Sequence, residues 1–119
     1  MSKIKVLVAD DDVAIGDVMQ ILLEENGYEV FFTGMPSEID NLLKKEPNII
    51  LLDIWMSGVS GKDVCERIKK DPVTKHIPVV LFSANRDTRE IAEQCGADGF
   101  IAKPFDISEI INIVKKFTS

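Results

Sequence analysis

Short apolar runs of strand character alternate with segments of helical periodicity five times along the chain, which limits the fold more than any other feature. The runs occupy residues 4–9, 28–32, 48–52, 77–82 and 99–102. Three of them, 4–9, 48–52 and 77–82, are nearly continuous in apolar residues, as expected of strands buried on both faces. The run at 28–32 carries Glu29 and suits a sheet edge. The pattern predicts a three-layer α/β protein, an open parallel (βα)5 sheet between two layers of helices.

The segments between the runs have helical spacing and residues that begin or end helices. In the first segment, apolar residues at i, i+3, i+4 and i+7 are predicted to form the buried face: Ile15, Val18, Met19 and Leu22. Helix starts are indicated at Pro36 and at the possible capping residues Ser60, Asp87 and Asp106. Helix ends are indicated at Asn26-Gly27, Asp71-Pro72 and Gly96.

Size, charge and cysteine content exclude several classes of protein. The 119 residues are expected to form one domain, residues 1–119. A net charge of −6 argues against nucleic-acid binding, because contact with the phosphate backbone requires a basic surface. The chain has no apolar run near the roughly 18 residues of a membrane span and no signal peptide, so we expect a cytoplasmic protein without membrane contact. Cys65 and Cys95 are too few for a disulfide framework and are expected to be reduced and packed.

Polar side chains with complementary chemistry follow four of the predicted strands. Asp10 and Asp11 follow the first run and Asp53 the third, whereas Ser83 follows the fourth and Lys103 the fifth. The carboxyl ends of parallel strands meet at one sheet edge, so three carboxylates there would repel one another unless they bound protons or a cation. Oxygen ligands favour Mg²⁺ or Mn²⁺. A lysine and a hydroxyl on the other side suit a phosphoryl group, so the pattern indicates metal-assisted phosphoryl transfer to a carboxylate.

Four linked motifs, VLVADDD, LLDIWMSGVSG, VVLFSA and FIAKPF, resemble the receiver domain of bacterial two-component response regulators. The resemblance spans nearly the whole chain and implies a flavodoxin-like strand order, 2-1-3-4-5. It implies that Asp53 accepts a phosphoryl group from a histidine kinase or a histidine phosphotransfer protein. It also implies that Asp10 and Asp11 form the acidic pair of a Mg²⁺ site, Asp11 binding directly and Asp10 mainly through water. The backbone carbonyl of Trp55 would be a further ligand.

The same resemblance assigns roles to the residues of the last two motifs. Ser83 would be the switch hydroxyl, Lys103 the lysine that pairs with phosphate, and Phe100 the switch aromatic whose rotation changes the surface of the fourth helix, fifth strand and fifth helix. A downstream effector domain or target protein would read that surface. The peptide bond between Lys103 and Pro104 is expected to be cis. The alternative for Phe100 is a ring that stays buried in the core.

Three features individualise the chain. Ser57 stands where the family most often has proline, so the loop after Asp53 is expected to be looser. Trp55 and Asn85 occupy positions that tune the lifetime of the phosphate in the family, and a bulky indole there predicts slow self-hydrolysis. The first helix has more apolar residues than one stripe requires, which indicates either a surface for the helices of a phosphodonor or simply a wide buried face.

Three other classes of protein fit the sequence less well than a receiver domain. A flavodoxin-like cofactor binder needs a glycine- and hydroxyl-rich phosphate loop where this chain has three aspartates. A haloacid-dehalogenase-like phosphatase carries its nucleophile after the first strand, which leaves Asp53 unexplained. The third is an interaction module that is not phosphorylated, although the complete set of pocket residues argues against it. The sequence leaves open the cognate kinase, the output, the oligomeric state, and whether this is a stand-alone receiver or part of a longer regulator.

Overall fold

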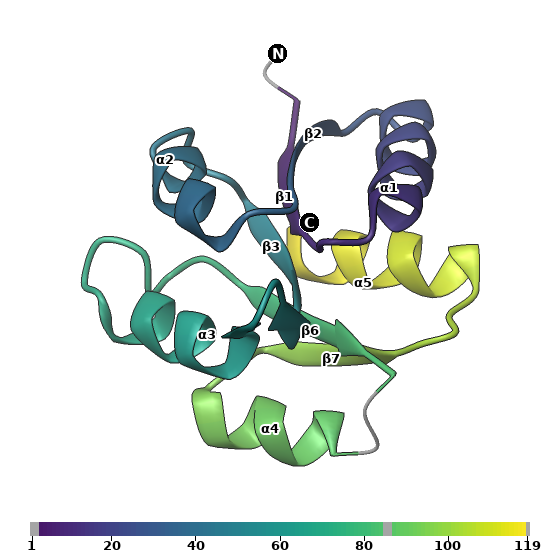
Figure 1. Cartoon of the computed structure of the whole chain (residues 1–119). Helices are drawn as coiled ribbons and strands as arrows, with labels where there is room; N and C mark the ends of the chain where they lie inside the picture. Colours follow the sequence, from purple (N-terminus) through teal and green to yellow (C-terminus); the bar gives the residue numbers. More distant parts are fainter. Residues whose placement is uncertain (1–2, 85–86, 119) are drawn as a thin grey trace.

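A computed structural model describes residues 3–84 and 87–118 of the chain. Five strands form a parallel sheet in the order β2-β1-β3-β6-β7 (Figure 1). Their bounds are β1 (Lys5–Ala9), β2 (Glu29–Thr33), β3 (Ile49–Asp53), β6 (Val79–Ser83) and β7 (Gly99–Ala102). These are the five predicted strands in chain order, with boundaries shifted by at most two residues, so the flavodoxin-like order 2-1-3-4-5 is confirmed.

The position of each strand in the sheet follows from its apolar content. Every residue of β3 and β6 is buried, as expected of strands with neighbours on both sides and helices on both faces. Strand β2 lies at the edge and keeps Glu29 exposed, which confirms the prediction made for that run. The sheet therefore places the ends of β1 and β3 next to each other in its interior.

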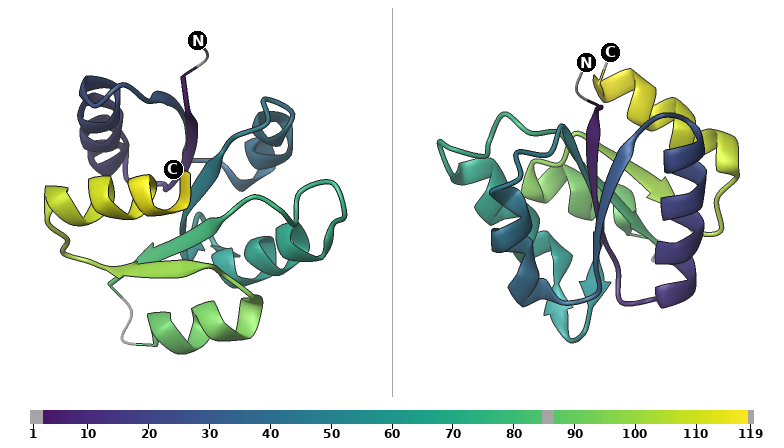
Figure 2. Two further views of the ribbon diagram at one scale, coloured as in Figure 1. Left: turned by 180° about the vertical axis from the view of Figure 1, so that it is seen from behind. Right: turned by 90° about the horizontal axis from the view of Figure 1, so that it is seen from above.

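Helices cover both faces of the sheet. They are α1 (Val13–Glu25), a short 3-10 turn η1 (Pro36–Glu38) that leads into α2 (Ile39–Leu43), α3 (Gly61–Lys70), α4 (Thr88–Cys95) and α5 (Ile107–Thr118). Helices α1 and α5 lie on one face, and α2, α3 and α4 lie on the other (Figures 1 and 2). None of the helices in the described residues has the length and apolar character that a membrane span requires.

Local capping explains where several helices begin and end. The Asp12 carboxylate accepts hydrogen bonds from the backbone N–H groups of Ala14, at 3.0 Å, and Ile15, at 3.4 Å, and so begins α1 directly beside Asp10 and Asp11. Gly96 ends α4 with a φ of 79°, a left-handed conformation that favours glycine. Ser60 stands at the predicted cap of α3, but its hydroxyl makes no capping hydrogen bond.

The buried face of α1 differs from the predicted one. Its buried residues are Gly16, Met19 and Leu23, whereas Val18 is 50% exposed. The Phe32 ring lies so close to Gly16 that a Cβ at that position would clash with it. The helix therefore packs on β2 through a residue without a side chain. As a result, the buried face of α1 is shifted by about one residue from the face that the apolar pattern predicts.

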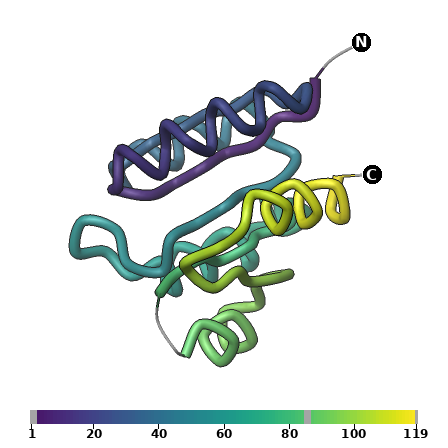
Figure 3. The backbone as a smooth tube through the Cα atoms, turned by 90° about the vertical axis from the view of Figure 1, so that its right-hand side faces the viewer, coloured from purple at the N-terminus to yellow at the C-terminus, as the bar shows by residue number. Residues whose placement is uncertain are grey.

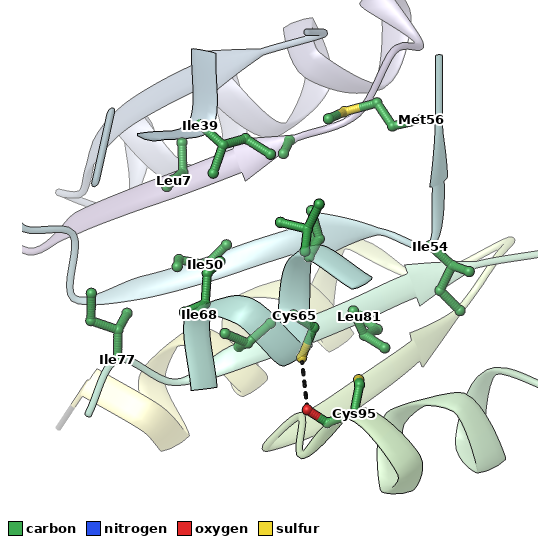
Figure 4. Close-up of a cluster of buried hydrophobic side chains, with 14 of the residues drawn as sticks. Leu7, Ile39, Ile50, Ile54, Met56, Cys65, Ile68, Ile77, Leu81 and Cys95 are labelled. Atoms are coloured by element: carbon green, nitrogen blue, oxygen red, sulfur yellow. Dashed lines mark hydrogen bonds between the residues drawn. The ribbon is translucent and has the colours of Figure 1, made fainter. Parts of the chain in front are cut away.

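Two apolar layers fill the space between the sheet and its helices. The layer toward α2, α3 and α4 includes Leu7, Ile50 and Leu81, together with both cysteines (Figure 4). The thiol of Cys65 lies 3.6 Å from the carbonyl oxygen of Cys95, and neither cysteine forms a disulfide. Burial and the neighbouring Cys95 raise the pKa of the Cys65 thiol far above its usual range. The two cysteines are thus reduced and packed, as predicted from the sequence.

A small hairpin follows β3 and was not predicted. Its strands are β4 (Trp55–Met56) and β5 (Val59–Ser60), which pair antiparallel through Met56 and Val59. In Figure 3 the hairpin projects from the edge of the sheet at which β1 and β3 end. Two short paired strands thus stand where the sequence predicted a loop, and the looseness attributed to Ser57 stays a prediction.

Candidate functional site

Three carboxylates meet where β1 and β3 end. Asp10 and Asp11 directly follow β1, and Asp53 is the last residue of β3. One carboxylate oxygen of each residue lies within 4.8 Å of an oxygen of the other two. Asp10 is fully buried and Asp53 nearly so, whereas Asp11 is exposed. The convergence predicted from the strand ends is therefore present, with one carboxylate facing solvent and two set into the protein.

Backbone N–H groups and one lysine hold these carboxylates. Asp10 accepts from the N–H of Asp12 at 2.9 Å, and its second oxygen lies 2.9 Å from Nζ of Lys103. Asp53 accepts from the N–H of Trp55 at 3.4 Å, and its other oxygen lies 3.8 Å from the same Nζ. Within residues 3–84 and 87–118, Lys103 is the one side-chain cation that pairs with these two buried carboxylates, so the described part of the cluster has excess negative charge.

The ionisation of Asp53 reflects its burial first and its charged neighbours second. Burial, and next the charge of Asp10, raise the pKa of Asp53 from 3.8 to about 6, although Lys103 acts in the opposite direction. The surroundings of Asp53 disfavour its ionised form, and Asp10 and Asp11 add carboxylate oxygens beside it. Such a set of oxygen donors fits a hard divalent cation such as Mg²⁺ or Mn²⁺. The donor set offers no imidazole or thiolate that would favour zinc.

Lys103 reaches the cluster from the end of β7. Its backbone N–H donates to the carbonyl oxygen of Ser83 at 2.9 Å, and the following bond to Pro104 is cis, as expected. Its Nζ also lies 4.8 Å from the centroid of the Phe82 ring. With only 18% of its side chain exposed, the ammonium group is fixed over the carboxylates instead of extending into solvent.

Ser83 and Phe100 lie on the same face of the sheet. In the register of β6 and β7, Ser83 pairs with Ala102 and Leu81 pairs with Phe100, so Ser83 and Phe100 are two residues apart on neighbouring strands. Ser83 is buried, whereas Phe100 is 41% exposed. The alternative in which Phe100 is a permanently buried core ring is therefore wrong.

Apolar side chains are exposed along α1, the helix that begins directly after the acidic cluster. Val13, Val18 and Ile21 of α1 are all exposed. An open, mostly apolar groove of about 480 Å³ is lined by Ile15 of the same helix and by Ala84, Lys103, Pro104 and Phe105. The simple alternative of a wide buried face is thus wrong for Val18 and Ile21, and part of the apolar surplus of α1 is surface.

Two contributors to the site were missed at the level of the sequence. The backbone N–H of Ser57 donates to a carboxylate oxygen of Asp11 at 2.9 Å. Gly61 packs so closely on the backbone of Asp53 and Ile54 that a Cβ there would clash with both. The only available signal was the pair of glycines in MSGVSG, since a backbone donor can belong to any residue except proline.

Comparisons with known proteins agree with this geometry. The family model described as "Response regulator receiver domain" matches residues 6–115. The CheY-like receiver domain protein of Methanospirillum hungatei is 27% identical, with a TM-score of 0.80 over 97% of this chain and 93% of that one. NtrX from Brucella abortus is 30% identical, with a TM-score of 0.83 over 96% of this chain but 26% of that one.

A third structure supports the fold alone. The chemotaxis protein CheY4 of Vibrio cholerae is 21% identical, with a TM-score of 0.87 over 98% of this chain and 99% of that one. Together with the family match over nearly the whole chain, these neighbours set aside the flavodoxin-like and dehalogenase-like alternatives. The chain belongs to the response regulator receiver domain family of two-component signalling.

Proposed function

We propose that this receiver accepts a phosphoryl group on Asp53 from a phosphohistidine donor and that the modification changes its α4–β7–α5 surface. The observation that carries the proposal is the placement of Lys103 between Asp10 and Asp53, with Nζ 2.9 Å and 3.8 Å from their oxygens. A buried carboxylate with a neighbouring fixed cation has both a nucleophile and a partner for the charge that a phosphoryl group adds.

The transfer itself is a displacement at phosphorus. An oxygen of Asp53 forms the new bond while the phosphorus–nitrogen bond of the donor breaks, and the electron pair of that bond stays on the imidazole nitrogen. Asp53 must be ionised to attack, and the N–H of Trp55 favours that form by donating to it. Lys103, already beside Asp53, then pairs with the phosphoryl oxygens.

The same pocket fits the divalent cation that this chemistry requires. Asp10, Asp11, Asp53 and the backbone carbonyl of Trp55 would hold Mg²⁺ or Mn²⁺. When bound, the cation would supply positive charge that neutralises the carboxylates and the incoming phosphoryl oxygens. The support for this assignment is the all-oxygen donor set and the raised pKa of Asp53.

The switch is proposed to run from Ser83 to Phe100. Phosphoryl oxygens on Asp53 attract the Ser83 hydroxyl, and its movement leaves space on the face that Phe100 shares. Phe100 is partly exposed in this structure, so inward rotation of its ring would alter the surface between α4 and α5. A downstream effector domain or target protein would read the altered surface.

The donor is proposed to be a histidine kinase or a histidine phosphotransfer protein, with docking on α1 beside the pocket. Support comes from the exposed apolar residues Val13, Val18 and Ile21 and from the groove next to Lys103. We also propose that the receiver acts in the cytoplasm and that it binds neither nucleic acid nor membrane itself. The acidic net charge supports the absence of nucleic-acid binding.

The proposal is tested by incubating the protein with a histidine phosphotransfer protein that carries a labelled phosphoryl group. We expect label to leave the donor and appear on this chain, within a peptide that contains Asp53. Retention of all label by several different donors in the presence of Mg²⁺ would contradict phosphoryl acceptance.

Lys103→Ala is expected to fold but to respond poorly to phosphorylation. The variant lacks the charge that pairs with the phosphoryl group, so the coupling between Asp53 and the α4–β7–α5 surface should fall by about 1–3 kcal/mol. Hydrogen exchange of the α4, β7 and α5 amides, with and without phosphoryl group, measures this coupling. Lys44→Ala, which changes an exposed lysine just after α2, is the control. A wild-type response in Lys103→Ala would contradict the assigned role.

Trp55→Ala is expected to lose its phosphoryl group several-fold faster than the wild type. The side chain of Trp55 follows the acceptor by two residues, and its bulk should restrict the water that attacks the acyl phosphate. The rate of label loss from purified phosphoprotein measures the effect. An unchanged or slower rate would contradict shielding. Asn85, to which the sequence assigns a similar influence, lies outside the described residues.

A further inference from the structure

The turn between β4 and β5 has an uncommon backbone conformation. Ser57 and Gly58 have φ values of 49° and 79°, and the residues on either side of them, Met56 and Val59, pair with each other. Positive φ at both central residues of a two-residue loop defines the type I′ turn, whose twist matches that of a β-hairpin. Proline, with φ fixed near −65°, has no place at position 57 of such a turn.

This turn is tied to the acidic cluster from two directions. The N–H of Ser57 donates to Oδ2 of Asp11 at 2.9 Å, across 46 positions in the chain. The hydroxyl of Ser57 donates to the carbonyl oxygen of Gly34 at 3.3 Å. Gly34 packs against the backbone of Asp10 and Asp11. A Cβ added to Gly34 would lie 3.4 Å from the carbonyl oxygen of Asp10 and 3.5 Å from Cα of Asp11. The hairpin is therefore attached both to the Asp11 side chain and to the loop that supports it.

Asp11 is the carboxylate of the cluster that most needs such support. Asp10 and Asp53 are buried and lie beside Lys103, whereas Asp11 is exposed. An exposed aspartate samples several rotamers, and its side chain must be held in one of them before its oxygen can serve as a ligand. A hydrogen bond to one oxygen restricts the carboxylate and leaves lone pairs free for a cation.

We propose that the Ser57-Gly58 turn is a positioning element for the cation site, in which the N–H of Ser57 holds Asp11 ready to bind Mg²⁺. The inference rests on the cation site proposed above and adds a residue that contacts neither the cation nor the phosphoryl group. Ser57 acts through Asp11, and the conformation of the turn places its N–H. The choice of serine over proline at position 57 thereby strengthens cation binding in this chain.

Titration of the metal-free protein with MgCl₂ tests the proposal without any phosphoryl transfer. The single tryptophan, Trp55, lies in the hairpin and provides the fluorescence signal, with calorimetry as a second readout. Ser57→Pro removes both the N–H and the positive φ, and we expect its dissociation constant for Mg²⁺ to rise about tenfold, a typical effect for a group that orients a metal ligand. Ser57→Gly keeps the N–H and the φ but loses the hydroxyl, and we expect near-wild-type affinity.

Gly58→Val is a second variant in case Ser57→Pro does not fold. A Cβ at Gly58 would meet no atom within 4 Å, so the space for a side chain is open there and the substitution acts by opposing the positive φ. We expect weaker Mg²⁺ binding here too. Urea unfolding in EDTA, measured on each variant, separates positioning from stability, since a structural role alone would lower stability and leave Mg²⁺ affinity unchanged.

The outcomes separate this inference from the proposed function. If the wild type binds Mg²⁺ and the folded Ser57→Pro and Gly58→Val variants bind it equally well, the inference is wrong while the cation site stands. The inference is also wrong if Ser57→Gly loses as much affinity as Ser57→Pro. If the wild type binds no Mg²⁺, the cation site itself fails, and the inference fails with it.

Discussion

Asp53→Asn is expected to take up no phosphoryl group from any donor while keeping its fold. The amide that replaces the carboxylate is neutral and a weak nucleophile, so its oxygen does not attack phosphorus and no acyl phosphate forms. Label on the intact protein after incubation with a phosphohistidine donor and Mg²⁺ measures the effect, and circular dichroism verifies the fold. Wild-type labelling of Asp53→Asn would assign the acceptor elsewhere.

Asp12→Asn is the matched control for that loss. Asp12 lies two residues from Asp10 and caps α1, a position where asparagine is as effective as aspartate. The variant removes one negative charge near the pocket but leaves the Asp10, Asp11 and Asp53 carboxylates in place. We expect it to be labelled like the wild type, so a loss confined to Asp53→Asn reports the acceptor and not the local charge.

Removal of the Asp53 carboxylate is expected to stabilise the metal-free protein at neutral pH. Burial and the charge of Asp10 raise the pKa of Asp53 from 3.8 to about 6, so the folded chain holds a proton that the unfolded chain releases. The contribution of Asp53 to stability therefore falls as pH rises from about 4 to 6 and stays low above that range. The rise in pKa sets an upper limit of about 3 kcal/mol on this effect, since solvent and Lys103 screen part of it.

Urea unfolding in EDTA at pH 4 and at pH 7.5 measures this effect. At pH 7.5 Asp53→Asn should exceed the wild type in free energy of unfolding by up to about 3 kcal/mol, and at pH 4 the difference should nearly vanish. Addition of Mg²⁺ should narrow the gap at pH 7.5, because cation binding stabilises the wild type. A variant that is equally or less stable than the wild type at pH 7.5 would show that the pocket does not strain Asp53.

The apolar pattern was sufficient to predict five strands that alternate with helices, whereas the strand order came from the resemblance to receiver domains. The apolar runs that became β3 and β6 are buried throughout, and Glu29 placed β2 at the edge. The buried face of α1 was less predictable. It runs through Gly16, which packs on the Phe32 ring, and a glycine adds nothing to an apolar pattern even where it makes the closest contact.

The candidate site was predictable as far as side chains define it. The carboxyl ends of parallel strands must meet, so Asp10, Asp53 and Lys103 could be placed together from their positions after apolar runs. The hairpin and the contact between Ser57 and Asp11 could not. They depend on a positive φ at a serine and on a backbone N–H, for which the glycines of MSGVSG are the only signal in the sequence.

The central claim is that the acidic cluster requires a divalent cation to make Asp53 a phosphoryl acceptor. The most direct test is to incubate the wild type with phosphoramidate, in MgCl₂ or in excess EDTA, and to measure the mass of the intact chain. We expect the mass of one added phosphoryl group in MgCl₂, its removal by hydroxylamine as for an acyl phosphate, and no addition in EDTA. Equal addition in both solutions, or none in either, would contradict the claim.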